Sequence, residues 1–342
     1  MNSDDLNIAI VGATGAAGGT AIDLLLERKH PAGKITVMAS ERSAGRKIPY
    51  GDAELTVIKA TADAFDGIDV ALFAAGGLVS RRLARKAVER GVFVIDKGSI
   101  FRMDPSIPLV VPEVNGDDID WHPGIVSTPN CTTTPLVMAL KPLHDLSPIK
   151  RVVVATYQST SGGGKAPMDE LFNQTRGIFT NQPVQKSQKN FTKQIAFNVI
   201  PHIDVFMDDG STKEEWKMMV ETKKILDPKI KLNATCVRVP VFVGHSEAVN
   251  IEFENELSAE QAQEILREAP GIMLIDKRED EGYVTPVESA GDSATYISRV
   301  RDDPTVDNGI TLWCVSDNLR KGAALNAVQI AELLGRECLK KG

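Results

Sequence analysis

The sequence is poor in cysteine, in aromatic residues and in long apolar runs. Only 4 of its 342 residues are cysteines, 5% are aromatic, and no two cysteines form a Cys-x-x-Cys pair. Disulfide frameworks occur in short, cysteine-dense chains, and zinc sites need closely spaced ligands, so the sequence predicts neither. No apolar run approaches the roughly 20 residues that cross a bilayer. These features favour a reduced, cytoplasmic protein without a metal site or a membrane anchor.

The charge and length exclude further classes. The start, Met1-Asn2-Ser3-Asp4-Asp5, is acidic, whereas a signal peptide begins with basic residues. A formal net charge of −7 argues against a nucleic-acid partner but still allows local cationic pockets for small anions. With 342 residues and 42% hydrophobic content, the chain is expected to form two domains.

The first part of the chain alternates between short apolar runs and helical patterns. Strands are expected at 8–11, 34–38, 70–73 and 92–95, and helices at 20–28 and 80–90. Wholly apolar runs are typical of parallel strands that are covered on both faces. The pattern predicts an α/β fold that begins with a doubly wound, Rossmann-type domain over residues 1–130.

The pattern changes after Pro129. A helix is expected at 131–146, strands at 151–158, 234–244 and 248–253, and loops with short helices at 162–190. These predict an α+β domain with an open mixed sheet over residues 131–321. A last helix, 322–342, carries an apolar stripe that is expected to be buried by completing the first domain; the stripe consists of Ala323, Ala327, Ile330 and Leu334.

A glycine-rich turn lies between the first strand and the first helix. It reads Gly12-Ala13-Thr14-Gly15-Ala16-Ala17-Gly18. Glycines allow close approach to a pyrophosphate, and a helix N-terminus offers N–H donors and a positive dipole end. A tight turn without a ligand is the alternative, but the strand-turn-helix context favours a dinucleotide site. Its predicted contacts are Gly12, Thr14, Gly15, Ala16 and Ala17.

The end of the second strand bears on the choice of cofactor. An NAD site usually has a carboxylate there for the ribose 2′-hydroxyl. Here Arg42 is flanked by Ser40 and Ser43, which suits a 2′-phosphate by charge and hydrogen bonding. Glu41 complicates the choice, because it could accept from a 2′-hydroxyl. We therefore expect NADP, with NAD as the alternative.

A candidate nucleophile and a candidate base follow. Cys131 stands at the start of a predicted helix, where the helix dipole stabilises a thiolate, although a free cysteine is often only a buried apolar residue. His245 is expected in a turn between two strands. His202, among apolar neighbours, is the rival, and it suits a structural histidine equally well. The other three histidines are expected on the surface or in loops.

Several motifs together resemble aspartate-semialdehyde dehydrogenase, from Ile8 to the final helix. The most specific are Pro129-Asn130-Cys131-Thr132-Thr133, Gln158-Ser159-Thr160-Ser161-Gly162, Phe101-Arg102-Met103-Asp104, Val237-Arg238-Val239-Pro240 and Gly244-His245-Ser246-Glu247. The resemblance implies oxidation of L-aspartate 4-semialdehyde with phosphate and NADP to L-4-aspartyl phosphate, in lysine, threonine, methionine and diaminopimelate biosynthesis. It also implies a homodimer or homotetramer, with 131–321 as the catalytic and dimerisation domain.

The same resemblance assigns roles to individual residues. Cys131 would be the nucleophile and would form a thioester, with Asn130 beside it as a further catalytic residue. His245 would shuttle protons, and Gln158 would orient the intermediate. The remaining roles are substrate carboxylate binding by Arg238, ammonium binding by Glu221, phosphate binding by Arg102 and Lys224, and contacts to the nicotinamide half of the cofactor by Ser161, Gly162 and Asn318.

The chain also departs from the family pattern. Lys97 and Gly98 stand where the family usually has Asn and a small hydroxyl residue, and Gly98 is expected to loosen that loop. Rival enzymes with thioester chemistry are glyceraldehyde-phosphate dehydrogenase and N-acetyl-glutamyl-phosphate reductase. A rival from another class is a catalytically silent nucleotide-binding paralogue, although Cys131 and His245 are both present.

Overall fold

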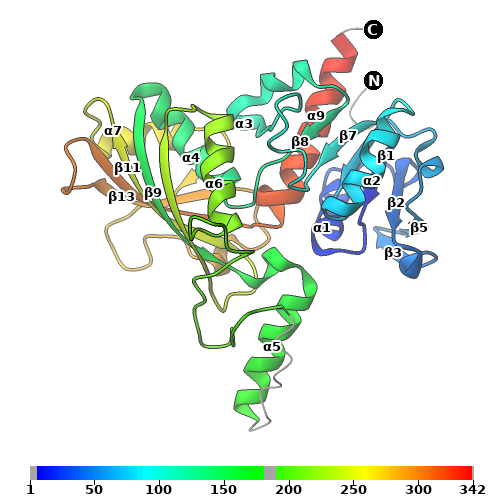
Figure 1. Cartoon of the computed structure of the whole chain (residues 1–342), viewed down its shortest axis with the longest axis horizontal. Helices are drawn as coiled ribbons and strands as arrows, with labels where there is room; N and C mark the ends of the chain where they lie inside the picture. The colour runs from blue at the N-terminus through cyan, green and yellow to red at the C-terminus, as the bar shows by residue number, and fades with distance from the viewer. Residues whose placement is uncertain (1–5, 181–189, 341–342) are drawn as a thin grey trace. The chain divides into compact units, whose positions relative to one another are not determined.

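The computed structural model describes residues 6–180 and 190–340, and it divides the chain into two units. The first unit comprises Met1–Asn130 and Ala323–Gly342, and the second comprises Cys131–Gly322. Figure 1 shows both. Residues 181–189, where loops and short helices were expected, lie outside the described residues. None of the helices within the described ranges is long and apolar enough to cross a membrane.

The first unit is built on a parallel sheet of six strands. Their order is β5-β2-β1-β6-β7-β8, and every neighbouring pair is parallel. This doubly wound arrangement confirms the predicted α/β fold. The strands are β1 (Ile8–Val11), β2 (Ile35–Ala39), β5 (Ile58–Lys59), β6 (Val70–Phe73), β7 (Phe93–Asp96) and β8 (Ile125–Ser127).

Helices cover both faces of this sheet because β1 is apolar on both sides. Ile8 and Ile10 join one core with α1 (Ala16–Glu27) and α9 (Leu325–Lys340). Ala9 and Val11 point the other way, into a core with α2 (Gly77–Val88). The predicted stripe of the last helix is buried, and three of its members lie in the first of these cores: Ala327, Ile330 and Leu334.

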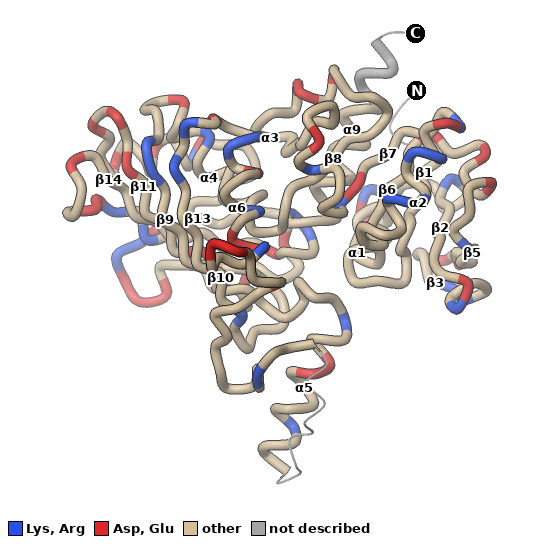
Figure 2. Tube along the Cα trace, viewed as in Figure 1, with Lys and Arg blue, Asp and Glu red and all other residues tan. Residues whose placement is uncertain are grey.

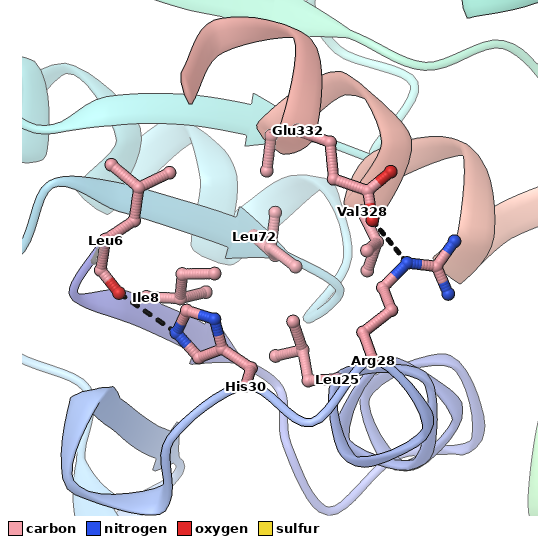
Figure 3. A pocket seen from close by; sticks show the side chains of 9 residues that line it. Leu6, Ile8, Leu25, Arg28, His30, Leu72, Val328 and Glu332 are labelled. Atoms are coloured by element: carbon pink, nitrogen blue, oxygen red, sulfur yellow. Dashed lines mark hydrogen bonds and ion pairs between the residues drawn. The ribbon is translucent and has the colours of Figure 1, made fainter. Parts of the chain in front are cut away.

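A small pocket lies among β1, β6, α1 and α9 and is shown in Figure 3. Its lining is mostly apolar, and the ion pair between Arg28 and Glu332 lies at its side. His30, in the loop after α1, is also part of the lining; it is 5% exposed, and its Nε2 lies 3.0 Å from the carbonyl oxygen of Leu6. The loop position of His30 was expected, but its burial was not.

The second unit is built on a mixed sheet with the strand order β10-β9-β11-β14-β13-β12. The two outer pairs, β10–β9 and β12–β13, are parallel, and the inner pairs are antiparallel. The mixed sheet was predicted. Its strands are β9 (Ile149–Gln158), β10 (Lys231–Arg238), β11 (His245–Phe253), β12 (Ile272–Leu274), β13 (Thr295–Asp302) and β14 (Gly309–Ser316).

Three helices of the second unit pack over one face of its sheet. They are α4 (Thr133–Leu146), α6 (Lys213–Ile225) and α7 (Ala259–Glu268). Their apolar residues share one core with Val152 and Val154 of β9 and with Val249 and Ile251 of β11. On the opposite face Tyr157 is 41% exposed, and its ring lies 5.4 Å from that of Trp313. This second face is therefore less covered by the unit itself.

Two expectations for local structure were wrong. The stretch expected to hold loops and short helices contains the 15-residue helix α5 (Lys165–Phe179). Its buried stripe is narrow, so its periodic signal is weak. The strand expected at 234–244 ends at Arg238, because Pro240 cannot donate to a ladder and Gly244 adopts a φ of +94°. His245 is therefore the first residue of β11 and does not lie in the turn.

Short elements complete the two units, and charges of both signs are interspersed along each of them (Figure 2). The hairpin strands are β3 (Lys47–Tyr50) and β4 (Ala53–Thr56), and the short helices are α3 (Pro112–Asn115) and α8 (Pro286–Ser289). A π-helical turn, Arg320–Ala324, precedes α9.

Candidate active site

Three strand ends bring polar side chains to one edge of the mixed sheet. Gln158 ends β9, Arg238 ends the parallel β10, and the two residues are paired. The antiparallel β11 begins at this edge with His245. All three side chains are buried, with exposures of 1%, 9% and 1%. Three predicted site residues, far apart in sequence, therefore form one polar row.

Arg238 is held in this row by a backbone contact and by charge. Its Nη1 donates a hydrogen bond of 2.6 Å to the carbonyl oxygen of Ser159. Burial lowers the pKa of Arg238, and the negative charges of Glu214 and Cys131 oppose that shift. The thiol of Cys131 thus lies within electrostatic reach of the guanidinium. A buried arginine at a strand end is well placed to bind an anion.

The amide of Gln158 has a fixed orientation. Its Oε1 accepts from the hydroxyl of Thr156 at 3.0 Å, and its Nε2 donates to Oε1 of Glu214 at 3.0 Å. The other carboxylate oxygen of Glu214 accepts from Lys217 at 3.0 Å, and Lys217 also donates to Asp204 at 2.8 Å. Two residues of α6, Glu214 and Lys217, therefore join the polar row through Gln158.

The carboxyl group of Glu214 is ionised despite its burial. Burial would raise its pKa, but Lys217, the hydrogen bonds from Gln158 and Lys217, and the charge of Arg238 lower that pKa to about 2. Burial likewise favours loss of the proton from Lys217, yet its acidic partners raise its pKa above the ordinary value. The row thus contains a carboxylate and two cations, a combination that can bind a zwitterion and a second anion.

Glu221 and Lys224, the predicted pair, lie further along the same helix. They follow Glu214 and Lys217 by seven residues, which is about 10 Å at 1.5 Å per residue. Glu221 is buried, with 1% exposure, and Lys224 is half-buried. The contact to Gln158 is made by Glu214. Glu214 and Lys217 thus belong to the row, and the predicted pair lies two helical turns further along α6.

The ring of His245 is anchored at one nitrogen. Its Nδ1 lies 3.0 Å from both the backbone nitrogen and the hydroxyl oxygen of Ser159. The rival, His202, is half-buried and stacks on Phe206 with ring centroids 4.2 Å apart. A Cβ added to Gly162 would lie 3.2 Å from Nε2 of His245 and 3.0 Å from Nη1 of Arg238. Gly162 therefore leaves room beside both groups.

Cys131 lies two residues before α4 and is half-buried. The helix was expected to include Cys131, but its N-cap is Thr132. The thiol still precedes a helix N-terminus, whose dipole stabilises an anion. Asn130, directly before it, is 6% exposed. A Cβ on Gly322 would lie 3.0 Å from the Cβ of Cys131, so glycine allows the two segments to approach closely.

Other cysteines of the second unit lack this setting. Burial raises the pKa of the Cys236 thiol well above its usual range, and the carboxyl group of Glu214 adds to the shift. Burial likewise raises the pKa of Cys314. Both are fully buried in the core. Of the three cysteines with described side chains, Cys131 is the one whose surroundings suit a nucleophile.

The hydroxyl group of Ser161 and the amide group of Asn318 extend the row. Ser161 donates to Oδ1 of Asn318 at 2.9 Å, and the same oxygen accepts from the backbone N–H of Gly244 at 3.0 Å. Ser161 and Asn318 are buried. The predicted nicotinamide-side residues Ser161, Gly162 and Asn318 thus gather beside His245.

The glycine-rich loop of the first unit has the shape that a pyrophosphate requires. Gly12 has a φ of +95°, and a Cβ there would lie 2.8 Å from the backbone of Ala74. A Cβ on Gly18 would lie 2.2 Å from the carbonyl oxygen of Gly12. Gly15 is the N-cap of α1, and Thr14 and Gly15 are exposed. The loop leaves its backbone accessible at a helix N-terminus, so it fits a dinucleotide phosphate.

In the loop after β2, the acidic residue and the basic residue have different surroundings. Ser43 is buried, whereas Ser40 and Arg42 are exposed. Glu41 forms an ion pair with Lys59. This carboxylate is therefore engaged by a neighbouring cation, and the exposed guanidinium of Arg42 is available to a phosphate.

Arg102 lies in the first unit, in a compact loop after β7. It is 7% exposed, and its Nη2 donates to the carbonyl oxygen of Lys97 at 2.8 Å. Oδ1 of the buried Asp96 accepts from Ser80 at 2.6 Å and from the backbone N–H of Gly98 at 3.1 Å. A Cβ on Gly98 would lie 3.0 Å from Oδ2 of Asp96, so a larger residue here would press against that side chain.

Four residues at the site were not singled out from the sequence: Ser159, Glu214, Lys217 and Gly322. A signal existed for two of them, since α6 carries two Glu–Lys pairs with the same spacing, seven residues apart on one helix face. Nothing local distinguishes the pairs. The choice depends on the tertiary contact to Gln158.

The two units define a class of protein, a two-domain nicotinamide-dependent dehydrogenase. Residues 7–122 match the model "Semialdehyde dehydrogenase, NAD binding domain", and residues 140–321 match "Semialdehyde dehydrogenase, dimerisation domain". The chain is 49% identical over 336 residues to the aspartate-semialdehyde dehydrogenase of Aquifex aeolicus, covering 97% of this chain and 98% of that relative. The chain therefore belongs to the aspartate-semialdehyde dehydrogenase family, which confirms the resemblance.

Solved structures agree. The structure of aspartate semialdehyde dehydrogenase II from Vibrio cholerae complexed with ASA has a TM-score of 0.93 at 46% identity, covering 97% of this chain and 98% of that one. The aspartate semialdehyde dehydrogenase from Candida albicans, solved with NADP, has a TM-score of 0.73 at 25% identity, covering 96% and 98%.

Proposed function

We propose that this chain oxidises L-aspartate 4-semialdehyde with phosphate and NADP to L-4-aspartyl phosphate, through a thioester on Cys131. The observation that carries the proposal is the polar row of Arg238, Gln158 and His245, with Cys131 in electrostatic reach of Arg238. The printed names of the relatives support the substrate, since they are aspartate-semialdehyde dehydrogenases. The reaction belongs to the biosynthesis of lysine, threonine and methionine.

Cys131 attacks the aldehyde carbon, and the resulting thiohemiacetal keeps its oxygen near the row. The helix dipole of α4 and the charge of Arg238 stabilise the attacking thiolate. His245 exchanges a proton with the substrate oxygen, and Gln158 orients the intermediate. NADP, when bound beside Ser161, Gly162 and Asn318, would supply the hydride acceptor. Phosphate then attacks the thioester and releases the thiolate of Cys131.

The zwitterionic substrate needs an arginine at one end and a carboxylate at the other. Arg238 binds its carboxylate in a bidentate manner. Its ammonium group is bound by Glu221, while the ionised Glu214 holds the amide of Gln158 in place. The attacking phosphate is bound by Lys224 together with Arg102. Lys217, which pairs with Glu214 and Asp204, keeps Glu214 ionised beside the row.

The cofactor is bound by the first unit and by the nicotinamide-side residues of the second. Gly12, Thr14, Gly15, Ala16 and Ala17 surround the pyrophosphate, as the backbone shape of that loop allows. The ribose phosphate is bound by Arg42 with Ser40 and Ser43, and Ser161, Gly162 and Asn318 meet the nicotinamide. NADP is favoured over NAD because Lys59 engages Glu41, the one carboxylate in that loop.

The protein acts as a homodimer through the less covered face of the mixed sheet. Support comes from the name of the second family model, a dimerisation domain, and from a shallow hollow on that face with the aromatic and arginine content typical of interfaces. The hollow is lined by Ala248, Tyr283, Thr285, Arg299, Arg301, Thr311, Leu312 and Trp313. A Trp313→Glu variant that runs as a monomer in light scattering supports this face; an unchanged mass contradicts it.

The compartment follows from the nucleophile. A catalytic Cys131 must stay a thiol, and Cys131, Cys236 and Cys314 are all free cysteines. A reducing, cytoplasmic setting is therefore part of the proposal.

The experiment that tests the reaction is a substrate panel. Formation of NADPH is followed with aspartate semialdehyde, glyceraldehyde 3-phosphate and N-acetylglutamate semialdehyde, each with and without phosphate. Phosphate-dependent NADPH formation from aspartate semialdehyde supports the proposal. A preference for another aldehyde identifies a different thioester-forming dehydrogenase, and binding of NADP without any turnover identifies a silent paralogue.

A further inference from the structure

Ser159 makes two contacts to the Nδ1 atom of His245. Its backbone nitrogen and its hydroxyl oxygen each lie 3.0 Å from Nδ1, and both residues are buried. A backbone N–H can only donate, so Nδ1 must accept in that contact. A neutral imidazole carries one proton, and this proton is then on Nε2. The carbonyl group of Ser159 also accepts from Arg238.

The hydroxyl group of Ser159 can accept a hydrogen bond, which its backbone N–H cannot. It lies 3.1 Å from Oδ1 of Asn318 and 3.0 Å from the hydroxyl of Ser161. An amide oxygen only accepts, so the hydroxyl can turn its proton toward Asn318 and offer a lone pair to Nδ1. Ser159 therefore places a donor and a potential acceptor at the same ring nitrogen.

We propose that Ser159 is a positioning residue that sets the protonation pattern of His245. This inference rests on the proposed function, in which His245 exchanges protons with the substrate. The N–H of Ser159 keeps the resting neutral ring as the Nε2–H tautomer. Its hydroxyl accepts from Nδ1–H in those forms of the ring that proton transfer passes through.

The proton balance shows why both groups are needed. The resting ring first takes up one proton from water, and the protonated ring then carries a proton on each nitrogen. When Nε2 gives its proton to the substrate oxygen, the remaining proton is on Nδ1, where it faces the N–H of Ser159. Two donors repel each other, and the lone pair of the hydroxyl relieves this conflict. In the reverse step Nε2 takes the proton back from the substrate oxygen while Nδ1 keeps its own.

A consequence follows for Cys131. The resting ring presents an N–H at Nε2, beside Gly162 and Arg238. Such a ring donates to an anion and does not remove the proton of the thiol. The thiolate is stabilised instead by Arg238 and by the N-terminus of α4. Burial raises the pKa of Glu247, two residues along β11, well above its usual range and so favours its uncharged form.

The tautomer can be measured in the unmodified protein. With only five histidines in the chain, ¹⁵N-histidine labelling gives a simple spectrum, and its comparison with His245→Asn assigns the ring of interest. Nitrogen shifts distinguish a protonated from an unprotonated ring atom. We expect Nδ1 unprotonated and Nε2 protonated in the neutral ring. A neutral ring with its proton on Nδ1 overturns the proposal, and this test needs no variant of Ser159.

The hydroxyl is tested by Ser159→Ala. The variant keeps the backbone N–H, so the resting tautomer should remain while kcat falls by about 10- to 30-fold with little change in KM, the effect of removing an acceptor from a charged donor. The matched control is Thr160→Val, which removes the next hydroxyl of the same turn, one that bonds the carbonyl of Val241 and not His245. Its spectrum and kcat should be close to those of the wild type.

These experiments test the role of Ser159 and the proposed function separately. Equal kcat values for Ser159→Ala and Thr160→Val contradict the role of the Ser159 hydroxyl. Full activity of His245→Asn contradicts the proton exchange itself, whichever tautomer the spectrum shows. We expect His245→Asn to lose about 10²- to 10⁴-fold in kcat, the usual contribution of general acid–base catalysis.

Discussion

The candidate site of the first unit consists of backbone groups, whereas that of the second unit consists of side chains. In the first unit the glycine-rich loop offers backbone: Gly12 and Gly18 leave no room for side chains, and the N-terminus of α1 faces outward. In the second unit the site consists of side chains from three strand ends and α6, among them Gln158, Arg238 and Glu214. A backbone site is encoded by local spacing, whereas a side-chain site depends on tertiary register. Substitutions should therefore affect chemistry in the second unit and cofactor affinity in the first.

The largest effect is expected for Cys131→Ala. Without the thiol no thioester forms, so turnover should fall to the background while NADP binding and thermal stability are kept. Alkylation of the wild type by iodoacetamide should be fastest at Cys131, because its thiolate is the stabilised one. Steady-state assays, NADP titration and peptide mapping measure these effects. Undiminished turnover would show that Cys131 is not the nucleophile. It would also contradict the view that side chains of the second unit carry out the chemistry.

Arg238→Lys should produce the next largest effect. The lysine keeps the charge but not the planar fork, so the substrate carboxylate is bound in looser poses. Misplacing the reacting carbon by about 1 Å can slow a reaction on the order of 10²-fold, and kcat/KM for the amino-acid substrate should fall by that order. NADP affinity should stay constant. An equal loss in NADP affinity would mean that Arg238 supports the whole unit.

The two Glu–Lys pairs of α6 give a matched test within one helix. Lys224→Ala should raise the KM for phosphate by about 10- to 100-fold, the effect of losing a charged hydrogen bond. Lys217→Ala should change that KM less and lower the melting temperature more, because Lys217 bonds Glu214 and Asp204. Melting temperatures of both variants are measured beside the kinetics. The reverse order of the two KM effects would move the phosphate site to Lys217.

The smallest effect is expected in the first unit, for Arg42→Ala. Loss of one exposed cation should raise the KM for NADP by about 10-fold and leave the KM for NAD nearly unchanged. Kinetics with both cofactors measure the difference. An equal rise for both would show that Arg42 supports the loop itself rather than the ribose phosphate.

The sequence predicted what depends on local pattern. The parallel strands, the glycine loop and the buried stripe of the last helix follow from apolar runs and spacing within a few turns. The sequence also predicted the mixed sheet and singled out Gln158 and Arg238 as polar candidate residues. His245 was misjudged as a turn residue, because β11 begins directly after Gly244 and no apolar pattern marks its first residue.

What the sequence could not predict depends on contacts between distant segments. Glu214 and Glu221 have the same local surroundings, an acidic residue three positions before a lysine, and the contact to Gln158 distinguishes them. Ser159 lies within the motif Gln158-Ser159-Thr160-Ser161-Gly162, but its contact to His245 joins positions 86 residues apart. The close approach of Ser80 to Gly98 likewise joins separate segments.

The most direct measurement of the central claim is a single-turnover experiment without phosphate. The protein is mixed with aspartate semialdehyde and NADP, the burst of NADPH is followed, and the intact protein is then weighed and digested. The account predicts a burst of one NADPH per subunit, an acyl adduct on the peptide that contains Cys131, and renewed turnover when phosphate is added. Steady NADPH formation that phosphate does not accelerate, or an adduct on any other residue, would contradict it.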